Sequence, residues 1–367
     1  YFRQRLDPSL WQHEEYGDTD HRLLPMEPAM ANGEPVTVDI DTRNGRISAR
    51  VWRTAVGRNT LLLLDSNVEG NSPEDRELTA RLYGGDHRVR IRQELLLGIG
   101  GVKALEALGI SPGVVHLNEG DSAFASLELI RRRMETEGIS FDEAMRRVSS
   151  HVVFTTHTPV PAGHDRFAPE LVEEHLGPVR DALGLSHEGL LALGRVNPHD
   201  WREEFCMTVL ALKSSHRANA VSSLHGHVSR AMWTGLFPGV REEHIPIGHV
   251  TNGVHVNSWL APQMRLVYER HLGADWIERS GDPALWEAID DIDDGELWEA
   301  HLTLKARLVA EVRRRLMVQA ERQGQPSSVI AQLRRVLSRD ALTIGFARRF
   351  ATYKRANLLL QDLAALE

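Results

Sequence analysis

A short β-branched run that ends in a polar loop decides the fold, and it reads Val152-Val153-Phe154-Thr155-Thr156-His157-Thr158-Pro159. Runs of this kind that stop at polar or proline-containing turns are typical of buried strands. Similar runs alternate with long helical patterns along most of the chain, which predicts an α/β protein with a mainly parallel sheet flanked by helices. In such a sheet ligands bind beyond the carboxyl ends of the strands, so the residues after each run are the functional candidates.

The same pattern analysis places the other elements. The expected strands lie at 36–40, 47–52, 60–64, 114–117, 152–156, 220–222, 249–251 and 341–346. Helical patterns occupy roughly 88–108, 123–137, 141–148, 203–217, 228–236 and 286–322. The last of these is rich in Arg and Glu, which indicates an exposed helix with charge pairs. Because a fresh strand follows an all-helical stretch, we expect domains at 1–252, 253–340 and 341–367, the last opening a second α/β unit.

Polar residues follow four of the expected strands, namely Asp65-Ser66-Asn67, Asn118-Glu119-Gly120-Asp121, His157-Thr158 and Asn252-Gly253. Amides, carboxylates and imidazoles can hydrogen-bond the many hydroxyls of a sugar. Such residues also start turns and cap helices, and at any one place that explanation is at least as good. Four of them at one sheet edge favour a cleft for a polar ligand.

His157 is the sharpest of these residues, because Pro159 and Pro161 stiffen its loop and leave the imidazole little entropy to lose. Taken alone, a histidine satisfied by local hydrogen bonds is the better explanation. A different signal follows the expected strand at 341–346, where Arg348, Arg349 and Lys354 precede a helix. Cations there oppose the helix dipole by about 0.3–1 kcal/mol each, and a bound anion would reverse that penalty. We favour a phosphate-type anion site over a solvated basic turn.

Composition excludes several classes of function. The chain has 43 Lys and Arg against 51 Asp and Glu, a formal charge of −8, which argues against a nucleic-acid scaffold. The single cysteine, Cys206, cannot form an intrachain disulfide, and no apolar run approaches the roughly 20 residues that cross a bilayer. We therefore expect no membrane segment and a cytoplasmic setting. The chain begins with Tyr1 and ends inside an amphipathic pattern, so we expect a piece of a longer protein.

Two weaker motifs point to structure. The run Gly98-Ile99-Gly100-Gly101 lacks a strand leading into it, so it predicts close helix packing and not a phosphate loop. The pair in His225-Gly226-His227 lacks a facing pair or carboxylate, and we expect no metal site there.

The basic corner is part of a longer motif, Gly345-Phe346-Ala347-Arg348-Arg349-Phe350-Ala351-Thr352-Tyr353-Lys354-Arg355, which resembles the arginine and lysine signature of the α-glucan (glycogen, starch) phosphorylases. Further motifs agree in order: Tyr1-Phe2-Arg3-Gln4-Arg5 with Trp11-Gln12, Tyr83-Gly84-Gly85-Asp86, Arg90-Ile91-Arg92-Gln93-Glu94, Leu117-Asn118-Glu119, Thr156-His157-Thr158, Arg195-Val196-Asn197-Pro198 and Thr251-Asn252-Gly253. The chain is most similar to the middle of the shorter, bacterial-type branch.

The resemblance implies a two-domain glycosyltransferase fold of the B type, with Rossmann-like parallel sheets and the active site between the domains. It implies phosphorolysis of the terminal α-1,4 bond of glycogen or a maltooligosaccharide by inorganic phosphate, which yields α-glucose 1-phosphate with retained configuration. The implied cofactor is pyridoxal phosphate, whose phosphate group serves as acid and base. A homodimer is a further expectation of the family.

The resemblance also implies site roles. His157 would lie at the glucose, and Arg349 and Lys354 would clamp the substrate phosphate. Tyr353 and Asn252 would bind glucose hydroxyls. Asp86 and His87 would belong to a gating loop, Asn118, Glu119 and Asp121 to the glucose pocket, and Arg348 to the cofactor phosphate.

The sequence departs from the family pattern in places. Ala351 and Thr352 stand where better-known members carry His and Glu, and Glu119-Gly120-Asp121 replaces Asp-Thr-His. The family's glycine-rich loop and its Schiff-base lysine segment are not in these 367 residues, so we expect the chain alone to be inactive. Two alternatives stay open: a nucleotide-sugar glycosyltransferase of the same fold, which would prefer ADP- or UDP-glucose, and a non-catalytic carbohydrate-binding fragment. A further alternative, a metallohydrolase, would be recognised by bound zinc.

Overall fold

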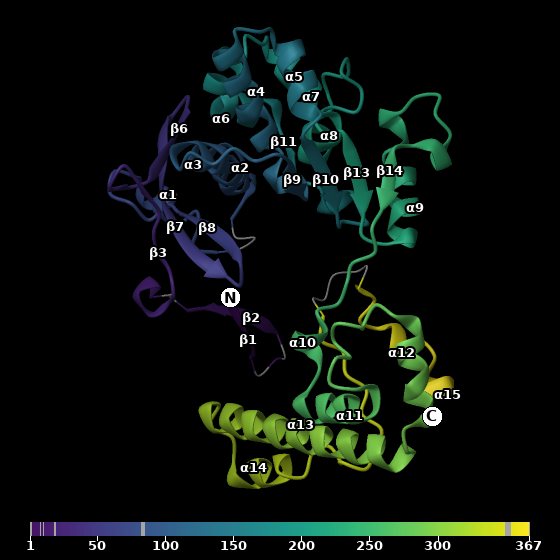
Figure 1. Cartoon of the computed structure of the whole chain (residues 1–367). Helices are drawn as coiled ribbons and strands as arrows, with labels where there is room; N and C mark the ends of the chain where they lie inside the picture. Colours follow the sequence, from purple (N-terminus) through teal and green to yellow (C-terminus); the bar gives the residue numbers. More distant parts are fainter. Residues whose placement is uncertain are drawn as a thin grey trace. The chain divides into compact units, whose positions relative to one another are not determined.

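The computed structural model describes residues 2–7, 9, 11–17, 20–81, 85–348 and 354–366. The chain divides into two compact units (Figure 1). The first consists of Tyr1–Arg5 and Gln12–Asn252, and the second of Leu6–Trp11 and Gly253–Glu367. In the described part of the chain no helix is both long and apolar enough to cross a membrane.

A four-stranded parallel sheet forms the centre of the first unit. Its strands are β9 (Val115–Asn118), β10 (Val152–Thr156), β13 (Arg217–Ala220) and β14 (Ile247–His249), in the order β14-β13-β10-β9. The predicted parallel sheet is thereby confirmed, although the last two strands begin two to three residues earlier than expected. These strands are only three or four residues long, so the periodic signal that places their ends is weak.

Helices pack on the parallel sheet and bury β10 on both faces. Val152 and Phe154 have almost no exposed surface, and their neighbours Thr155 and Thr156 are also buried. The helices in contact with the sheet include α5 (Phe141–Ser149), α8 (Met207–Lys213) and α9 (Ser223–Met232). Burial on both faces explains why β10 reads as a nearly continuous apolar run in the sequence.

A second sheet in the first unit is antiparallel. It contains β3 (Glu27–Pro28), β6 (Thr37–Thr42), β7 (Gly45–Val56) and β8 (Asn59–Asp65), with β7 pairing with all three others. The expectation that residues 60–64 join the parallel sheet is therefore wrong. Short two-residue connections join β6 to β7 and β7 to β8, and such hairpins can only join antiparallel strands.

The predicted helix over 88–108 is confirmed, with a π-helical turn at its centre. It runs as α2 (His87–Leu95), η2 (Leu96–Gly100) and α3 (Gly101–Ala107). The turn η2 contacts strands of the antiparallel sheet and α4 (Phe124–Glu137). A Cβ atom on Gly98 would lie 2.6 Å from the backbone nitrogen of Ala125, so glycine is required for this approach. The predicted close helix packing at this motif is correct.

The first unit also contains the following strands and helices, of which the two longest helices contribute buried residues to its core. They are β1 (Phe2–Leu6), β2 (Gln12–Tyr16), β4 (Met30–Ala31), β5 (Glu34–Pro35), α1 (Pro73–Arg76), β11 (Arg166–Phe167), α6 (Pro169–Ala182), α7 (His187–Gly194) and β12 (Phe205–Cys206). The helix expected over 203–217 is shorter than predicted, because its first residues form β12 and only Met207–Lys213 is helical.

The second unit is helical, as the pattern predicts. Its helices are α10 (Val256–Trp259), α11 (Pro262–Leu272), α12 (Pro283–Glu287), α13 (Asp294–Arg322), α14 (Ser327–Leu333) and α15 (Leu363–Leu366). Its small core consists of Leu272, Trp276 and Leu285. Helix α13 carries the predicted charge pairs, for example from Glu311 to Arg314 and Arg315.

The strand expected over 341–346 is a wrong prediction, because the chain is irregular there. A strand must pair its backbone groups with a neighbouring strand. Among the described residues of 253–366 no other strand is present to pair with it. The ammonium group of Lys305 instead donates to the carbonyl oxygen of Ala341.

Candidate functional site

The carboxyl ends of β9 and β10 lie side by side and bring two of the predicted polar segments together. The strands pair in parallel, with Leu117 opposite Phe154 and Asn118 opposite Thr155. The backbone of Glu119 continues this pairing, since its N–H donates to the carbonyl oxygen of Thr155 at 2.9 Å. The residues after β9 therefore lie beside the loop that starts at His157.

The His157 loop is held by the side chains of Asn118, the last residue of β9, and Glu119, which follows it. The His157 Nε2 atom lies 2.9 Å from Oδ1 of Asn118. One carboxylate oxygen of Glu119 accepts hydrogen bonds from the backbone N–H of His157 at 2.5 Å and the hydroxyl of Thr158 at 2.9 Å. Because an amide oxygen only accepts, the Nε2–H group of His157 donates this hydrogen bond. His157 is exposed, so a ligand can reach its ring.

Asp86 and His87 lie at the start of α2. The carboxylate of Asp86 caps the helix by accepting from the backbone N–H groups of Arg88 and Val89. These hydrogen bonds, that from Val89 above all, lower the pKa of Asp86. The Nδ1 atom of His87 lies 3.0 Å from the carbonyl oxygen of Arg166. Among the described residues, no direct hydrogen bond links this pair to His157.

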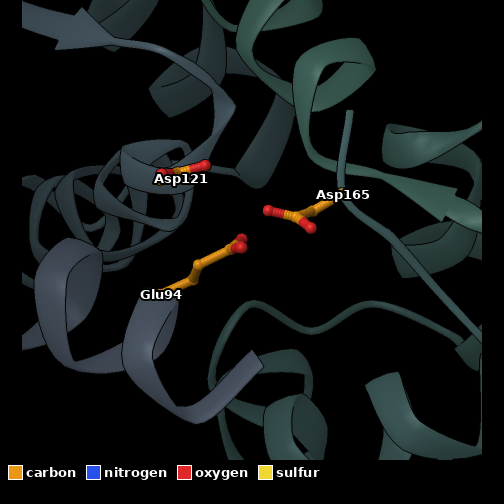
Figure 2. Close-up of side chains that lie close together, drawn as sticks. All are labelled: Glu94, Asp121 and Asp165. Atoms are coloured by element: carbon orange, nitrogen blue, oxygen red, sulfur yellow. The ribbon is translucent and has the colours of Figure 1, made fainter. Parts of the chain in front are cut away.

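Asp121 belongs to a cluster of three carboxylates that the sequence analysis did not predict as a group (Figure 2). Oxygen atoms of Glu94, Asp121 and Asp165 lie within 4.8 Å of one another, and the side chains point toward a common centre. One guanidinium nitrogen of Arg90 lies 3.2 Å from Glu94, 3.2 Å from Asp121 and 2.7 Å from Asp165. An arginine thus supplies the positive charge at the place where a metal ion would have to bind, and we assign no metal to this cluster.

One carboxyl group of this cluster has its neutral form favoured by its surroundings. Burial raises the pKa of Glu94 well above its usual value, and the neighbouring Asp165 and Asp121 carboxylates raise it further. Burial also disfavours the charged form of Asp165, but the hydrogen bond and the positive charge of Arg90 help to outweigh that effect, and the pKa of Asp165 is lowered. Glu94 and Asp165 form an acid pair in which the fold favours the neutral form of Glu94. The i, i+4 spacing of Arg90 and Glu94 on one helix was the only feature of the sequence that pointed to this cluster.

A cavity of about 580 Å³ adjoins this cluster at the edge of β9. Its walls are mainly apolar side chains of β8, η2 and α3, including Leu62, Leu64, Leu96 and Val102. Sugar hydroxyls need many hydrogen-bonding partners, and an apolar wall leaves them unsatisfied. The polar loop at His157 is accordingly the better candidate for a carbohydrate site.

The other predicted site residues are spread over both units. Asn252 ends the first unit, and its backbone N–H donates to the carbonyl oxygen of Val221 at 3.1 Å. Arg348 and Lys354 belong to the second unit, the former exposed and the latter half-buried. Arg349 and Tyr353 lie outside the described residues.

The segment Asp65-Ser66-Asn67 is not part of the polar edge, which corrects the expectation from the sequence. It follows β8 of the antiparallel sheet. Its carboxylate accepts a hydrogen bond from the indole N–H of Trp52 at 3.1 Å and one from the backbone of Asn67. These contacts are local and structural.

The fold and the His157 loop define an α/β protein with a polar constellation at the carboxyl edge of a parallel sheet, the usual ligand position in this class. The chain matches no protein-family model. It is 40% identical to the maltodextrin phosphorylase of Thermococcus litoralis, 41% to the glycogen phosphorylase of Mycobacterium tuberculosis and 36% to that of Aquifex aeolicus. Each comparison covers 100% of this chain, and 43%, 43% and 52% of the relatives.

The chain is thus similar over its whole length to glycogen and maltodextrin phosphorylases, and it spans about half the length of the curated relatives it matches. Its mixed α/β architecture with a parallel sheet is consistent with a glycosyltransferase-B-type phosphorylase domain.

Proposed function

We propose that the protein acts as an α-glucan phosphorylase. It would cleave terminal α-1,4 bonds of glycogen or maltodextrin with inorganic phosphate and release α-glucose 1-phosphate with retained configuration. The observation that carries this proposal is the His157 loop, whose imidazole is oriented by Asn118 and Glu119 at the carboxyl edge of the parallel sheet. The identity to glycogen and maltodextrin phosphorylases along the whole chain supports it.

The proposed roles follow the family motifs. His157, Arg349 and Lys354 are the proposed catalytic residues, the first at the glucose and the other two at the phosphate, where cations stabilise the charge that develops. The proposed substrate-binding residues are Asn252, Tyr353, Asp86, His87, Asn118, Glu119 and Asp121. Of these, Asp121 is committed to Arg90 through an ion pair of 3.2 Å, so it would act in glucose binding only together with that arginine.

Pyridoxal phosphate is the cofactor that the family implies, and Arg348 is proposed to approach its phosphate. Three of the lysines do not fit a covalent site for it. Three of the four lysines, Lys103, Lys213 and Lys305, direct their ammonium groups at backbone carbonyl oxygens. Burial lowers the pKa of Lys213, but its amine donates to the carbonyl oxygens of Ala192 and Arg195.

The decisive assay is phosphate-dependent release of glucose 1-phosphate from maltodextrin by the protein that carries this sequence, supplied with pyridoxal phosphate. We expect activity from it and none from the isolated 367 residues. Glucosyl transfer from ADP- or UDP-glucose without phosphorolysis would instead identify a nucleotide-sugar glycosyltransferase. Binding of maltooligosaccharide without turnover in either assay would identify a non-catalytic carbohydrate-binding protein.

Two histidines at opposite ends of β10 provide a matched pair of variants. Both His151 and His157 are exposed, but only His157 follows the carboxyl end of the strand. We expect His157→Gln to reduce kcat by on the order of 100-fold, because a positioned imidazole typically contributes that much or more. The control His151→Gln should retain kcat, and equal losses in the two variants would argue against the proposed site.

A further inference from the structure

Glu119 adopts a backbone conformation that a glutamate rarely tolerates. Its φ is 67° and its ψ is 170°, which lies outside the regions that L-amino acids normally populate and in one that is essentially reserved for glycine. The neighbouring contacts hold it there. The Glu119 N–H is bonded to Thr155, and a Cβ atom on the next residue, Gly120, would lie 3.0 Å from the backbone nitrogen of Thr208.

A glycine at position 119 would relieve this strain, so the glutamate side chain must supply something that glycine lacks. What it supplies is visible in its contacts, because one carboxylate oxygen bridges the backbone of His157 and the hydroxyl of Thr158. Charge-assisted hydrogen bonds of this kind are roughly twice as strong as neutral ones. Non-glycine residues in strained conformations persist where the surrounding structure enforces them, and they concentrate at functional sites.

We propose that Glu119 is a positioning residue, which holds the backbone of the His157 loop at the expense of its own backbone strain. This assignment rests on the proposed function and deepens it, since Glu119 would act through His157 in addition to lining the glucose pocket. Asn118 orients the imidazole ring, and Glu119 fixes the main chain that carries the ring. Asn118 and Glu119 at the end of β9 thus orient different parts of His157.

Three substitutions distinguish the effect of the two hydrogen bonds that the Glu119 side chain accepts, here called the anchor, from the effect of its backbone strain. Glu119→Gly removes both, Glu119→Ala removes the anchor and keeps the strain, and Glu119→Gln keeps an oxygen that can accept both hydrogen bonds. If Glu119 acted only through its charge on the substrate, Glu119→Gln would be as damaging as Glu119→Gly. Asn32→Gly is the matched control for strain relief, because Asn32 is another non-glycine residue of the first unit with positive φ, 52°.

The readouts are the thermal midpoint, hydrogen–deuterium exchange of the peptide that spans residues 154–160, and kcat. For Glu119→Gly we expect a thermal midpoint no lower than that of the wild type, together with faster exchange and a lower kcat, each by about 10-fold or more, since two hydrogen bonds are lost. Glu119→Ala should exchange as fast and unfold at a lower temperature. Glu119→Gln should keep slow exchange, because its amide oxygen can still accept both hydrogen bonds. Asn32→Gly should leave exchange and kcat unchanged.

Two results would overturn the assignment: slow exchange in Glu119→Gly, or fast exchange in Glu119→Gln. Exchange and thermal midpoint do not depend on phosphorolysis, so they test the anchor even if the wild-type protein releases no glucose 1-phosphate. Absence of that product from the wild type would count against the proposed function alone.

Discussion

The same sequence signal leads to different structures in the two sheets of the first unit. In both, a polar segment follows an apolar strand. At the end of β8 in the antiparallel sheet, Asp65 accepts a hydrogen bond from the indole N–H of Trp52 on the adjacent strand β7. After β9 and β10 of the parallel sheet, Asn118 and Glu119 reach the next strand end and hold His157. Parallel strands finish at one edge, so their terminal residues meet, whereas neighbouring antiparallel strands finish at opposite edges.

The sheets also differ in burial. Strand β6 alternates buried and exposed residues, as expected of a sheet with one face in water, and β8 has exposed leucines such as Leu63. Strand β10 is covered on both faces, with Phe154 fully buried. We therefore expect the parallel sheet to carry more of the first unit's stability per residue.

The largest expected effect comes from Phe154→Ala in the parallel sheet. Removing a fully buried aromatic side chain should lower the free energy of unfolding of the first unit by about 3–5 kcal/mol. The control Leu63→Ala in the antiparallel sheet, where the leucine is 39% exposed, should lower it by about 1 kcal/mol or less. Urea denaturation measures the free energy of unfolding of both variants. Equal losses in the two variants would show that the sheets do not differ in their contribution to stability.

Protonation of His164 should produce the next largest effect. This histidine lies in the loop after β10, bonded to the hydroxyl of Thr208 at 2.8 Å, and burial lowers its pKa to about 4. The unfolded chain, with a pKa near 6.5, therefore takes up the proton first. The free energy of unfolding should fall by up to roughly 3 kcal/mol as the pH drops from about 6.5 to about 4.

Urea denaturation at several pH values, with His164→Asn beside the wild type, isolates this contribution. Other carboxylates and histidines affect both proteins alike, so the difference between the two pH profiles is the readout. Parallel profiles would show that His164 is not held neutral by the fold.

Two glycines in and beside the π-helical turn, which adjoins the antiparallel sheet, test how tightly this segment packs against α4. Gly98→Ala should destabilise the first unit by about 1–3 kcal/mol, since the new methyl group would meet the backbone of Ala125 at 2.6 Å. Gly101 has helical dihedral angles, and a methyl group added there would have no other atom within 4 Å, so Gly101→Ala should stabilise by about 0.5–1 kcal/mol. A lower thermal midpoint for Gly98→Ala together with a higher one for Gly101→Ala would support this packing. Shifts of the same sign in both variants would contradict it.

The smallest expected effect separates structure from function at the two strand ends. Asp65→Ala removes the acceptor of two hydrogen bonds and Asn118→Ala the acceptor of one, and each of these bonds is worth about 1 kcal/mol in stability. Only Asn118→Ala should reduce kcat for phosphorolysis, because only Asn118 orients the His157 ring. A reduced kcat in Asp65→Ala at unchanged stability would show that both sheets serve the active site.

Long periodic helices and well-flanked strands were predictable from the sequence. The helix over 88–108 and the strand at 152–156 are confirmed. Helix α6 was not predicted, because it contains Pro178, which normally interrupts a helix, directly after Gly177. The strand expected at 341–346 failed for a different reason, since a strand depends on a partner that local sequence does not reveal.

The candidate site was predictable to a similar degree. The polar residues after β9 and β10 were identified because each follows an apolar run, and the structure brings Asn118, Glu119 and His157 into contact. The acid pair of Glu94 and Asp165 was not identified. Its members lie 71 residues apart by number, on α2 and before β11, and only the fold makes them neighbours.

The sequence by itself determined the types of the main elements and the chemistry at the strand ends, because both depend on the order of side chains over a few residues. Tertiary structure alone decided which strands are parallel, which strand ends meet, and that Glu119 holds a backbone conformation suited to glycine. Those properties arise from hydrogen bonds and packing between distant segments, and these contacts exist only once the chain has folded.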